Sequence, residues 1–207
     1  LLEEGVLAKE SWQPLINLAE KILKQESKDL EVCAWLLEGL LREQQFKGLI
    51  KGFLIIKQIV EKYWGTFFPR AVENDELLPL TPVLGLAGSN RGSVLSAPIY
   101  MMPLFNCDNG VISVWDYLQA SDNEKESNDA LKDTKTLQQL KKSCKTLPAD
   151  GFVKLDNEVK QVLSIIKSLH QALVNVSGHI WVCSFSKLQD TLIDCQKAIH
   201  YLGDFAF

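Results

Sequence analysis

The chain has 207 residues, of which 46% are hydrophobic and 23% charged, an ordinary composition for a globular protein with a substantial core. Its 22 basic and 26 acidic side chains give a net charge of -4, so the positive excess typical of nucleic-acid-binding proteins is missing. We therefore expect no nucleic-acid partner. The longest apolar stretch, GLIKGFLIIKQIV, contains Lys51 and Lys57 and is too short to cross a bilayer, so we expect no membrane insertion by this chain.

Helical spacing of apolar residues recurs along the chain, whereas strand-like alternation never persists, so the sequence predicts an all-α fold without a β-sheet. A first helix is expected to begin at the N-cap Ser11, with Trp12 and Pro14 in its first turn, and to end near residue 25. A second helix opens at Ser27 or Asp29 and ends near residue 44 or 45. Its buried face is predicted to contain Leu30, Cys33, Ala34, Leu37 and Leu41.

The third predicted helix, 46–64, contains Gly48 and Gly52 on one stripe. Glycine inside a helix costs ~1 kcal/mol relative to alanine, so a compensating gain is expected. We predict that the chain turns sharply at 44–46 and that the helix with Gly39 packs antiparallel against the third helix, with the small residues at the crossing. The apolar face of the third helix is predicted to contain Leu49, Phe53, Ile56, Val60 and Tyr63.

Residues 65–82 are rich in proline and acidic side chains, so they are expected to form an exposed loop. Phe67 and Phe68 are expected to turn inward from this loop. Thr81 and Pro82 then suit the cap and first position of a short helix.

A second short helix is predicted over 93–99, followed by a loop with the sequence PLFNCDNG. The next helix begins where Ser113 and Asp116 have the spacing of a capping arrangement. The polar stretch SDNEKESNDALKD is interpreted as a linker that begins as mobile chain. We expect a single helical domain over 1–207, with a possible internal boundary near 121–130.

Heptad spacing of apolar residues follows this linker and predicts antiparallel, supercoiled helices. The sequence SGHIWVCS is expected to connect the last two of them. The fold class is therefore a multi-helix bundle with short central helices and a C-terminal antiparallel helical hairpin. The expected core positions are Leu137, Leu140, Cys144, Leu147, Leu155, Val159, Val162, Ile166, Leu169, Leu173, Val176, Leu188, Leu192, Cys195, Ile199 and Leu202.

The cysteines are odd in number, widely spaced and without a C-x-x-C pair, which favours free thiols in a reducing cytoplasm over a disulfide framework. Three of them fall on apolar helix faces, where a thiol behaves as a small hydrophobe. The five cysteines are Cys33, Cys107, Cys144, Cys183 and Cys195.

No segment carries a motif for catalysis, cofactor binding or metal binding. GLAGSNRGS lacks the spacing and the lysine of a phosphate loop, and Asp75 and Glu76 lie in a predicted loop that does not hold them at a working separation. His179 and Cys183 form only a loose pair. We therefore expect a protein that is not an enzyme, with no catalytic residue, cofactor or metal. A site assembled from distant residues stays open, with the candidates His170, Cys195 and His200.

The function is then expected to reside on a surface, although the residues that bind a partner are unknown from the sequence. The third helix carries a stripe of exposed lysines, which is more often a solvated face than a docking patch: Lys47, Lys51 and Lys62. The tryptophans are interpreted as core or hinge packing: Trp12, Trp35, Trp64, Trp115 and Trp181.

The stretch SKDLEVCAWLLEGLLREQQFKGLIKGFLIIKQIVEKYWGTFFP, residues 27–69, resembles the signature of the ImpA N-terminal domain family, found in TssA-type proteins of bacterial type VI secretion systems. The shared features are a helix start at 27–30, AWLLEGLL at 34–41, F-x-G-L-x-x-G at 46–52, and then YW and a proline. Weaker similarity covers 7–202. The segment LAGSNRGSVLSAPIYMMPLF fits the family only loosely.

The resemblance implies a non-enzymatic assembly role in the cytoplasm of Gram-negative bacteria, at the inner face of the inner membrane in the assembled machine. The implied partners are proteins of the apparatus: baseplate, contractile sheath, inner tube or membrane complex. The family supplies no catalytic residue. We also expect this chain to be an N-terminal fragment, with self-association of the full-length protein through a missing C-terminal region.

Two other functions stay open at this stage. One is a related protein anchored in the inner membrane that caps or stops the distal sheath end, for which a membrane-spanning helix beyond residue 207 is expected. The other is a general helical adaptor unrelated to secretion.

Overall fold

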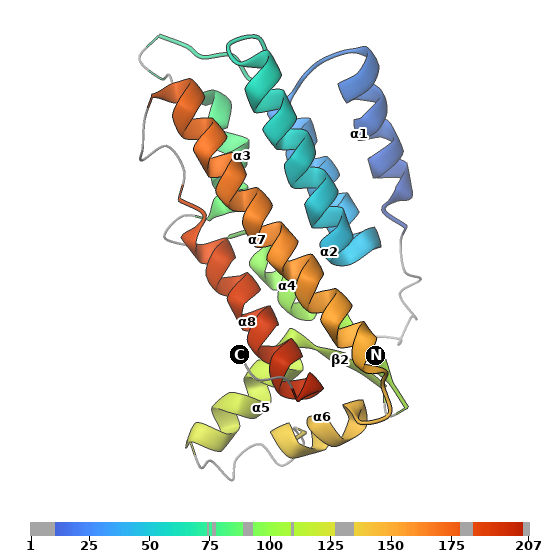
Figure 1. Cartoon of the computed structure of the whole chain (residues 1–207). Coiled ribbons are helices and arrows are strands. Elements are labelled where there is room, and N and C mark those ends of the chain that lie inside the picture. The colour runs from blue at the N-terminus through green and yellow to red at the C-terminus, as the bar shows by residue number, and fades with distance from the viewer. Residues whose placement is uncertain are drawn as a thin grey trace, which may run out of the picture.

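Eight α-helices, one 3₁₀ turn and one β-hairpin make up the described part of this computed structural model (Figure 1). The structure describes residues 11–73, 75, 78–88, 93–108, 110–126, 135–178 and 184–204. The predicted all-α class is confirmed, because helices dominate the fold. The elements are α1 Gln13–Gln25, α2 Leu30–Tyr63, η1 Leu78–Leu80, α3 Thr81–Ala87, α4 Ser96–Met101, β1 Pro103–Cys107, β2 Gly110–Ser113, α5 Val114–Glu126, α6 Leu137–Cys144, α7 Ala149–Ser177 and α8 Ser186–Gly203.

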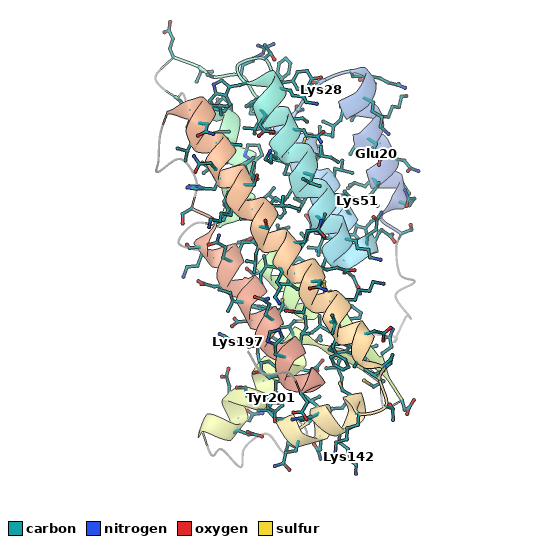
Figure 2. All side chains as sticks on the ribbon, in the orientation of Figure 1. Glu20, Lys28, Lys51, Lys142, Lys197 and Tyr201 are labelled. Atoms are coloured by element: carbon teal, nitrogen blue, oxygen red, sulfur yellow. The ribbon has the colours of Figure 1, made fainter. Side chains whose placement is uncertain are left out.

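The long helices lie side by side in the order α1, α2, α7 and α8, with α2 packed most extensively against α7 (Figure 1). The shorter helices α3 and α4 lie behind this layer. The hairpin, α5 and α6 close one end of the molecule. At this end the ring of Tyr201 on α8 packs against Tyr117 on α5, with 5.7 Å between centroids, and Lys142 lies on α6 below them (Figure 2).

Helix α2 consists of two arms, 30–44 and 46–63, joined by a bend at Gln45, where φ is 54° and ψ is -134°. Asp29 caps the first arm by accepting hydrogen bonds from the amides of Glu31 and Val32. The sharp turn expected at 44–46 is therefore confirmed, and of the two caps proposed for this helix the structure selects Asp29.

The glycines of the second arm allow the two arms to pack closely, as predicted. A Cβ at Gly48 would lie 1.9 Å from the carbonyl oxygen of Leu40, and one at Gly52 would lie 2.7 Å from Cγ of Leu37. Gly39 has a different neighbour. Its missing Cβ would meet side chains of α1, at 3.0 Å and 3.1 Å, so the expectation that Gly39 shares the crossing is wrong.

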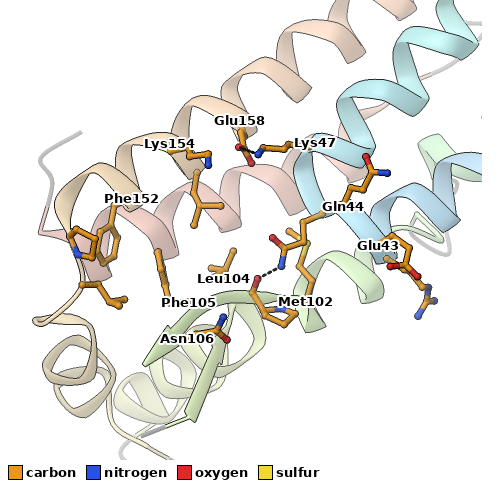
Figure 3. A pocket seen from close by; sticks show the side chains of 17 residues that line it. Glu43, Gln44, Lys47, Met102, Leu104, Phe105, Asn106, Phe152, Lys154 and Glu158 are labelled. Carbon is orange, nitrogen blue, oxygen red and sulfur yellow. Dashed lines mark hydrogen bonds and ion pairs between the residues drawn. The ribbon is translucent and has the colours of Figure 1, made fainter. Parts of the chain in front are cut away.

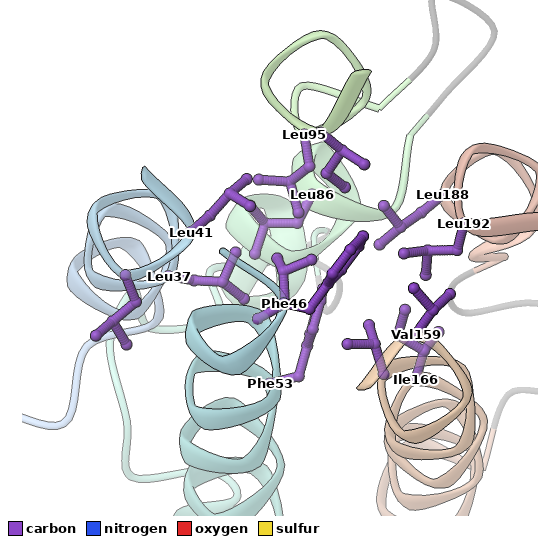
Figure 4. Packing of buried hydrophobic residues seen from close by; sticks show 14 of the residues in the cluster. Leu37, Leu41, Phe46, Phe53, Leu86, Leu95, Val159, Ile166, Leu188 and Leu192 are labelled. Atoms are coloured by element: carbon purple, nitrogen blue, oxygen red, sulfur yellow. The ribbon is translucent and has the colours of Figure 1, made fainter. Parts of the chain in front are cut away.

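The hydrophobic core lies between the second arm of α2 and the C-terminal pair α7 and α8. Phe46 and Phe53 are fully buried there and point toward leucines of α3 and α8 (Figure 4). The ring of Phe53 meets that of Phe185 edge-to-face at 6.3 Å. Burying each such aromatic side chain contributes roughly 1.5–3 kcal/mol, so this contact helps to hold the two halves of the chain together.

The predicted C-terminal helical hairpin is confirmed, since α8 returns along α7 and Asp156 near the start of α7 contacts His200 near the end of α8. The heptad positions of both helices are buried, apart from Leu155 and Val176, which are half-buried. The expected connection SGHIWVCS lies mostly outside the described residues.

The hairpin of β1 and β2 corrects the expectation of a loop at PLFNCDNG and of a fold without any sheet. The strands are short, and the register is irregular between Pro103 and Phe105, so that Leu104 and Phe105 are both buried. This irregularity removes the alternation by which a strand is recognised in a sequence. Capping of α5 is as predicted: the amide of Ser113 donates to Asp116 at 2.8 Å, and the Asp116 amide donates to Ser113 Oγ at 3.3 Å.

Several boundaries and side-chain placements differ from the prediction. The N-cap residue of α1 is Trp12 and not the predicted Ser11, although Ser11 Oγ accepts a hydrogen bond from the amide of Gln13. Phe67 is buried, whereas Phe68 is 43% exposed beside Arg70 and does not turn inward.

The short central helices are displaced slightly: α3 begins after Leu80, and α4 runs later than the expected 93–99. The expected linker is helical up to Glu126 at the end of α5, and residues 127–134 lie outside the described part. The suggested internal boundary near 121–130 therefore stays a prediction, as does the single domain over 1–207.

Candidate functional site

The bend of α2 is tied to β1 by one side chain. Gln45 Nε2 donates a hydrogen bond of 2.9 Å to the carbonyl oxygen of Pro103. The positive φ of Gln45 is rare for a residue with a side chain and costs about 1–3 kcal/mol, so the surrounding contacts must hold the backbone in place. Since glycine would adopt this backbone without strain, the presence of glutamine indicates a use for its side chain.

A groove of about 680 Å³ opens beside this bend, between α2, β1 and the start of α7 (Figure 3). The lining residues come from three separate stretches of the chain. They are Arg42, Glu43, Gln44, Gln45, Lys47, Met102, Pro103, Leu104, Phe105, Asn106, Leu147, Pro148, Gly151, Phe152, Lys154, Leu155 and Glu158.

The floor of the groove is apolar and well packed. Leu104, Phe105 and Phe152 are each buried, and the rings of Phe105 and Phe152 lie 4.4 Å apart between centroids. Half-buried Leu147 and Leu155 continue this surface. The floor of the groove is therefore an apolar surface.

The rim of the groove is charged. Lys47 Nζ lies 3.9 Å from Glu158 Oε1, and Lys154 is exposed one helical turn before Glu158 on α7 (Figure 3). Lys154 makes no ion pair with any residue in the described part of the chain. Glu43 is already used, because it accepts a hydrogen bond of 2.6 Å from the amide of Trp12. Two ammonium groups thus line the groove at this side of the rim, and that of Lys47 contacts the carboxylate of Glu158.

The lysine stripe predicted on α2 is exposed, but it does not form one patch. Lys47 lies at the groove, and Lys51 donates to the side chain of Gln44 at its edge. Lys62 lines a second, smaller hollow of about 310 Å³, which lies between α1 and α2 near Glu20 and Lys28 (Figure 2). A charge reversal at all three lysines would therefore alter two different surfaces.

The candidate residues for a distributed catalytic site do not come together. His200 and Gln196 of α8 and Lys160 of α7 all donate to the carboxylate of Asp156, at 2.8, 3.0 and 2.7 Å. His170 lies about four turns further along α7, roughly 21 Å at 1.5 Å per residue. His179 and Cys183 lie outside the described residues.

The carboxylate of Asp156 serves to join α7 and α8. Burial alone would raise the pKa of Asp156, but the hydrogen bonds from Lys160, Gln196 and His200 together outweigh burial and leave the pKa below 3.8. The ionised carboxylate only accepts hydrogen bonds, so Nε2 of His200 carries the proton in this contact. The hydrogen bonds from Gln196 and His200 to Asp156 therefore link α8 to α7.

The described cysteines are free thiols, as expected. Burial raises the pKa of Cys195 far above its ordinary value and that of Cys33 to about 12, so both stay protonated at neutral pH. Cys107 and Cys144 bring their sulfur atoms within 3.9 Å of each other. Burial, with the neighbouring Cys107, raises the pKa of Cys144 to about 12.

The remaining predicted site residues occupy ordinary positions. Trp12 is partly buried against the core, whereas Trp35, Trp64 and Trp115 are 52%, 37% and 41% exposed and are not core residues. Of the predicted alternatives, core or hinge packing, Trp64 fits the second, because its ring packs edge-to-face on Phe67 in the turn after α2. Trp181 lies outside the described residues. Within the described chain no cluster of acidic, histidine and cysteine side chains could hold a metal ion, and no helix there is long and apolar enough to span a membrane.

Sequence reasoning missed the groove, because its walls are brought together from distant stretches. One signal was available in the sequence. Asp108, Asn109 and Gly110 are typical of a tight hairpin turn, and recognising them would have placed a strand at β1. Nothing in the sequence indicated a strained backbone at Gln45.

The helices have the arrangement of a known class of domain. The structure resembles the N-terminal domain, including the conserved ImpA_N region, of the TssA component of the type VI secretion system from Burkholderia cenocepacia. The TM-score is 0.79, with 20% sequence identity over 93% of this chain and 78% of that chain. This likeness defines the fold class as that of a TssA N-terminal domain.

Residues 5–88 match the ImpA_N family, described as ImpA, N-terminal, type VI secretion system. No curated protein matches the chain. The matched region contains α1, α2 and α3, and therefore the bend at the groove, whereas β1 and α7 lie beyond it.

Proposed function

We propose that this chain is a non-enzymatic interaction domain that contributes to baseplate and contractile tail-sheath assembly in type VI secretion. The observation that carries the proposal is the match of residues 5–88 to the ImpA_N family. The likeness of the whole chain to a TssA N-terminal domain supports it. The partners would be baseplate, sheath, inner-tube or membrane-complex proteins, and the domain would work in the bacterial cytoplasm, at the inner face of the inner membrane in the assembled machine.

The geometry supports binding more readily than bond-making chemistry. Cys195, the nucleophile of the distributed-site alternative, is buried and its pKa is raised by burial, so it is neither ionised nor accessible. His200 is engaged with Asp156. The groove at the bend of α2 instead offers an apolar floor and a charged rim, which is the composition of a protein-binding surface.

The test is the formation of sheaths in living cells. In the bacterium that encodes the chain, the gene is deleted and the sheath subunit is followed as a fluorescent fusion. We expect extended sheaths to disappear and to return when the intact gene is restored. Normal sheath assembly and secretion in the deletion strain would refute the proposed function.

A matched variant separates binding from catalysis. His170→Ala combined with Cys195→Ala removes two of the three distributed-site candidates while sparing the contact of His200 with Asp156. We expect secretion to stay normal in this strain. Complete loss of secretion, with a circular dichroism spectrum and a melting temperature like those of the wild type, would favour an enzyme.

A further inference from the structure

The strand β1 presents its edge to the groove. Five consecutive residues, 102–106, line the groove, whereas none of the residues of β2 does. A strand that presented one face would contribute every second side chain, together with those of the neighbouring strand. The carbonyl of Pro103 also accepts its hydrogen bond from Gln45, which lines the same groove. In the described part of the chain the sheet has only two strands, so β1 has a strand partner on one edge only.

An open strand edge inside a groove is a binding site for an extended peptide that adds a further strand. The apolar floor at Leu104, Phe105 and Phe152 suits alternate apolar side chains of such a peptide. A helix would leave the polar edge of the strand without a partner, so the observations favour an extended ligand.

The charges at the rim select an acidic ligand. Lys47 and Lys154 both line the groove; Lys47 lies 3.9 Å from the carboxylate of Glu158, and Lys154 makes no ion pair within the described part of the chain. A carboxylate supplied by the ligand would complete an alternating row of charges at this rim. Gln45, whose backbone is strained, lines the groove and donates a hydrogen bond to Pro103 at the start of β1, where it fixes the position of the strand.

From these observations we propose that the groove between α2, β1 and α7 binds an extended acidic segment of a partner protein, which pairs with the open edge of β1 and places a carboxylate between Lys47 and Lys154. The idea rests on the proposed function, because it assigns to the assembly domain a site for one of its partners. It also states the conformation and charge that the partner must have.

The probe is a fluorescein-labelled hexapeptide of alternating valine and glutamate, titrated into the full chain and followed by fluorescence anisotropy. Two matched peptides serve as controls: one has lysine in place of glutamate, and the other has alternate backbone amides methylated so that it cannot form a strand. We expect saturable binding of the acidic peptide alone, with amide chemical-shift changes concentrated at 104–106 in nuclear magnetic resonance spectra.

The variant Lys47→Glu with Lys154→Glu should weaken this binding by about tenfold or more, because two favourable charge contacts become repulsive. The matched control is Lys62→Glu with Lys142→Glu, which makes the same change of charge at exposed positions away from the groove and should bind like the wild type. Both variants are checked for an unchanged circular dichroism spectrum.

Three results would overturn the proposal. These are absence of binding, equal binding of the methylated peptide, and binding that appears only after residues 1–10 are removed, since the groove would then belong to the chain's own terminus. The cellular experiment distinguishes the two proposals. If sheath assembly requires the gene but proceeds normally with Lys47→Glu and Lys154→Glu, the groove is not the partner site and the proposed function still stands.

Discussion

Gly48 and Leu40 lie on the two arms of α2 so close together that a Cβ on Gly48 would be 1.9 Å from the Leu40 carbonyl oxygen. Backbone atoms cannot move aside as the end of a side chain can. We therefore expect Gly48→Ala to force the arms apart and to lower the free energy of unfolding by about 3 kcal/mol or more. Urea denaturation followed by circular dichroism measures this loss.

Other glycines provide a graded series for the same measurement. Gly52→Ala should cost less than Gly48→Ala, because its new Cβ meets the side chain of Leu37 first, and Gly39→Ala should cost less still. The matched control is Gly85→Ala in α3, where the Cβ meets nothing within 4 Å and a gain of up to ~1 kcal/mol is expected. Equal effects at Gly48 and Gly85 would show that the arms do not touch as described.

The strain at Gln45 predicts a difference between two small substitutions. Gln45→Ala loses the hydrogen bond to Pro103 and keeps the positive φ, so the free energy of unfolding should fall by ~1 kcal/mol. Gln45→Gly loses the same bond but relieves the backbone, so it should be more stable than Gln45→Ala by about 1 kcal/mol or more. Thermal unfolding of the two variants, side by side, tests this order; the reverse order would contradict the strain.

The carboxylate of Asp156 predicts how stability depends on pH. Its pKa in the folded protein is below the ordinary value of 3.8, so the ionised form stabilises the fold above pH 3.8. This contribution is lost as the pH falls through the lower, folded-state pKa. Urea unfolding between pH 6 and pH 2 should therefore give a flatter stability curve for Asp156→Asn than for the wild type.

An exposed carboxylate supplies the control for this pH experiment. The pKa of Asp204 is also lowered, by a hydrogen bond and the charge of Lys141, but Asp204 is in contact with solvent. Asp204→Asn should leave the curve close to that of the wild type, since water and salt screen exposed pairs. If the Asp156→Asn curve kept the full wild-type slope, the ionised Asp156 carboxylate would contribute nothing to the pH dependence of the free energy of unfolding.

The neighbouring thiols of Cys107 and Cys144 predict selective cross-linking. Diamide, which removes two hydrogens from a pair of thiols, should join these two cysteines, because Cys107 is the one described cysteine that is not fully buried and it lies beside Cys144. The reaction should spare Cys33 and Cys195, which are buried. The reaction should quicken as the pH rises, because the raised pKa of Cys144 keeps its thiolate scarce at neutral pH. Peptide mass spectrometry identifies the linked pair; a main product that contains Cys195 would mean that β1 and α6 lie elsewhere.

The sequence predicted best those elements whose signals are local. The cap at Asp29, the turn near Gln45 and the heptads of α7 and α8 each depend on residues a few positions apart, and the structure confirms all of them. The crossing of the α2 arms was also accessible, because two glycines inside one apolar helix require a close neighbour to offset their conformational freedom.

The groove was beyond sequence reasoning for a physical reason. Its rim depends on Lys47 and Glu158, which are distant in the chain and meet only after α7 has packed against α2. The strand β1 was missed because an irregular register buries two successive side chains and hides the alternation. The positive φ of Gln45 was missed because the surrounding contacts impose this backbone conformation. Only glycine marks such a conformation in a sequence, and this position is a glutamine.

The burial of the second arm of α2 against α7 and α8 limits where the chain can be truncated. The region that matches the ImpA_N family ends at residue 88. The buried side chains of Phe46 and Phe53 in this region are covered by residues of α7 and α8, which lie much later in the chain. A fragment that ends at residue 88 would expose this apolar surface to water. We therefore expect the fragment to aggregate, which size-exclusion chromatography would detect. The end of the matched region is therefore not expected to be the boundary of an independently folding unit, because the later helices cover its apolar surface.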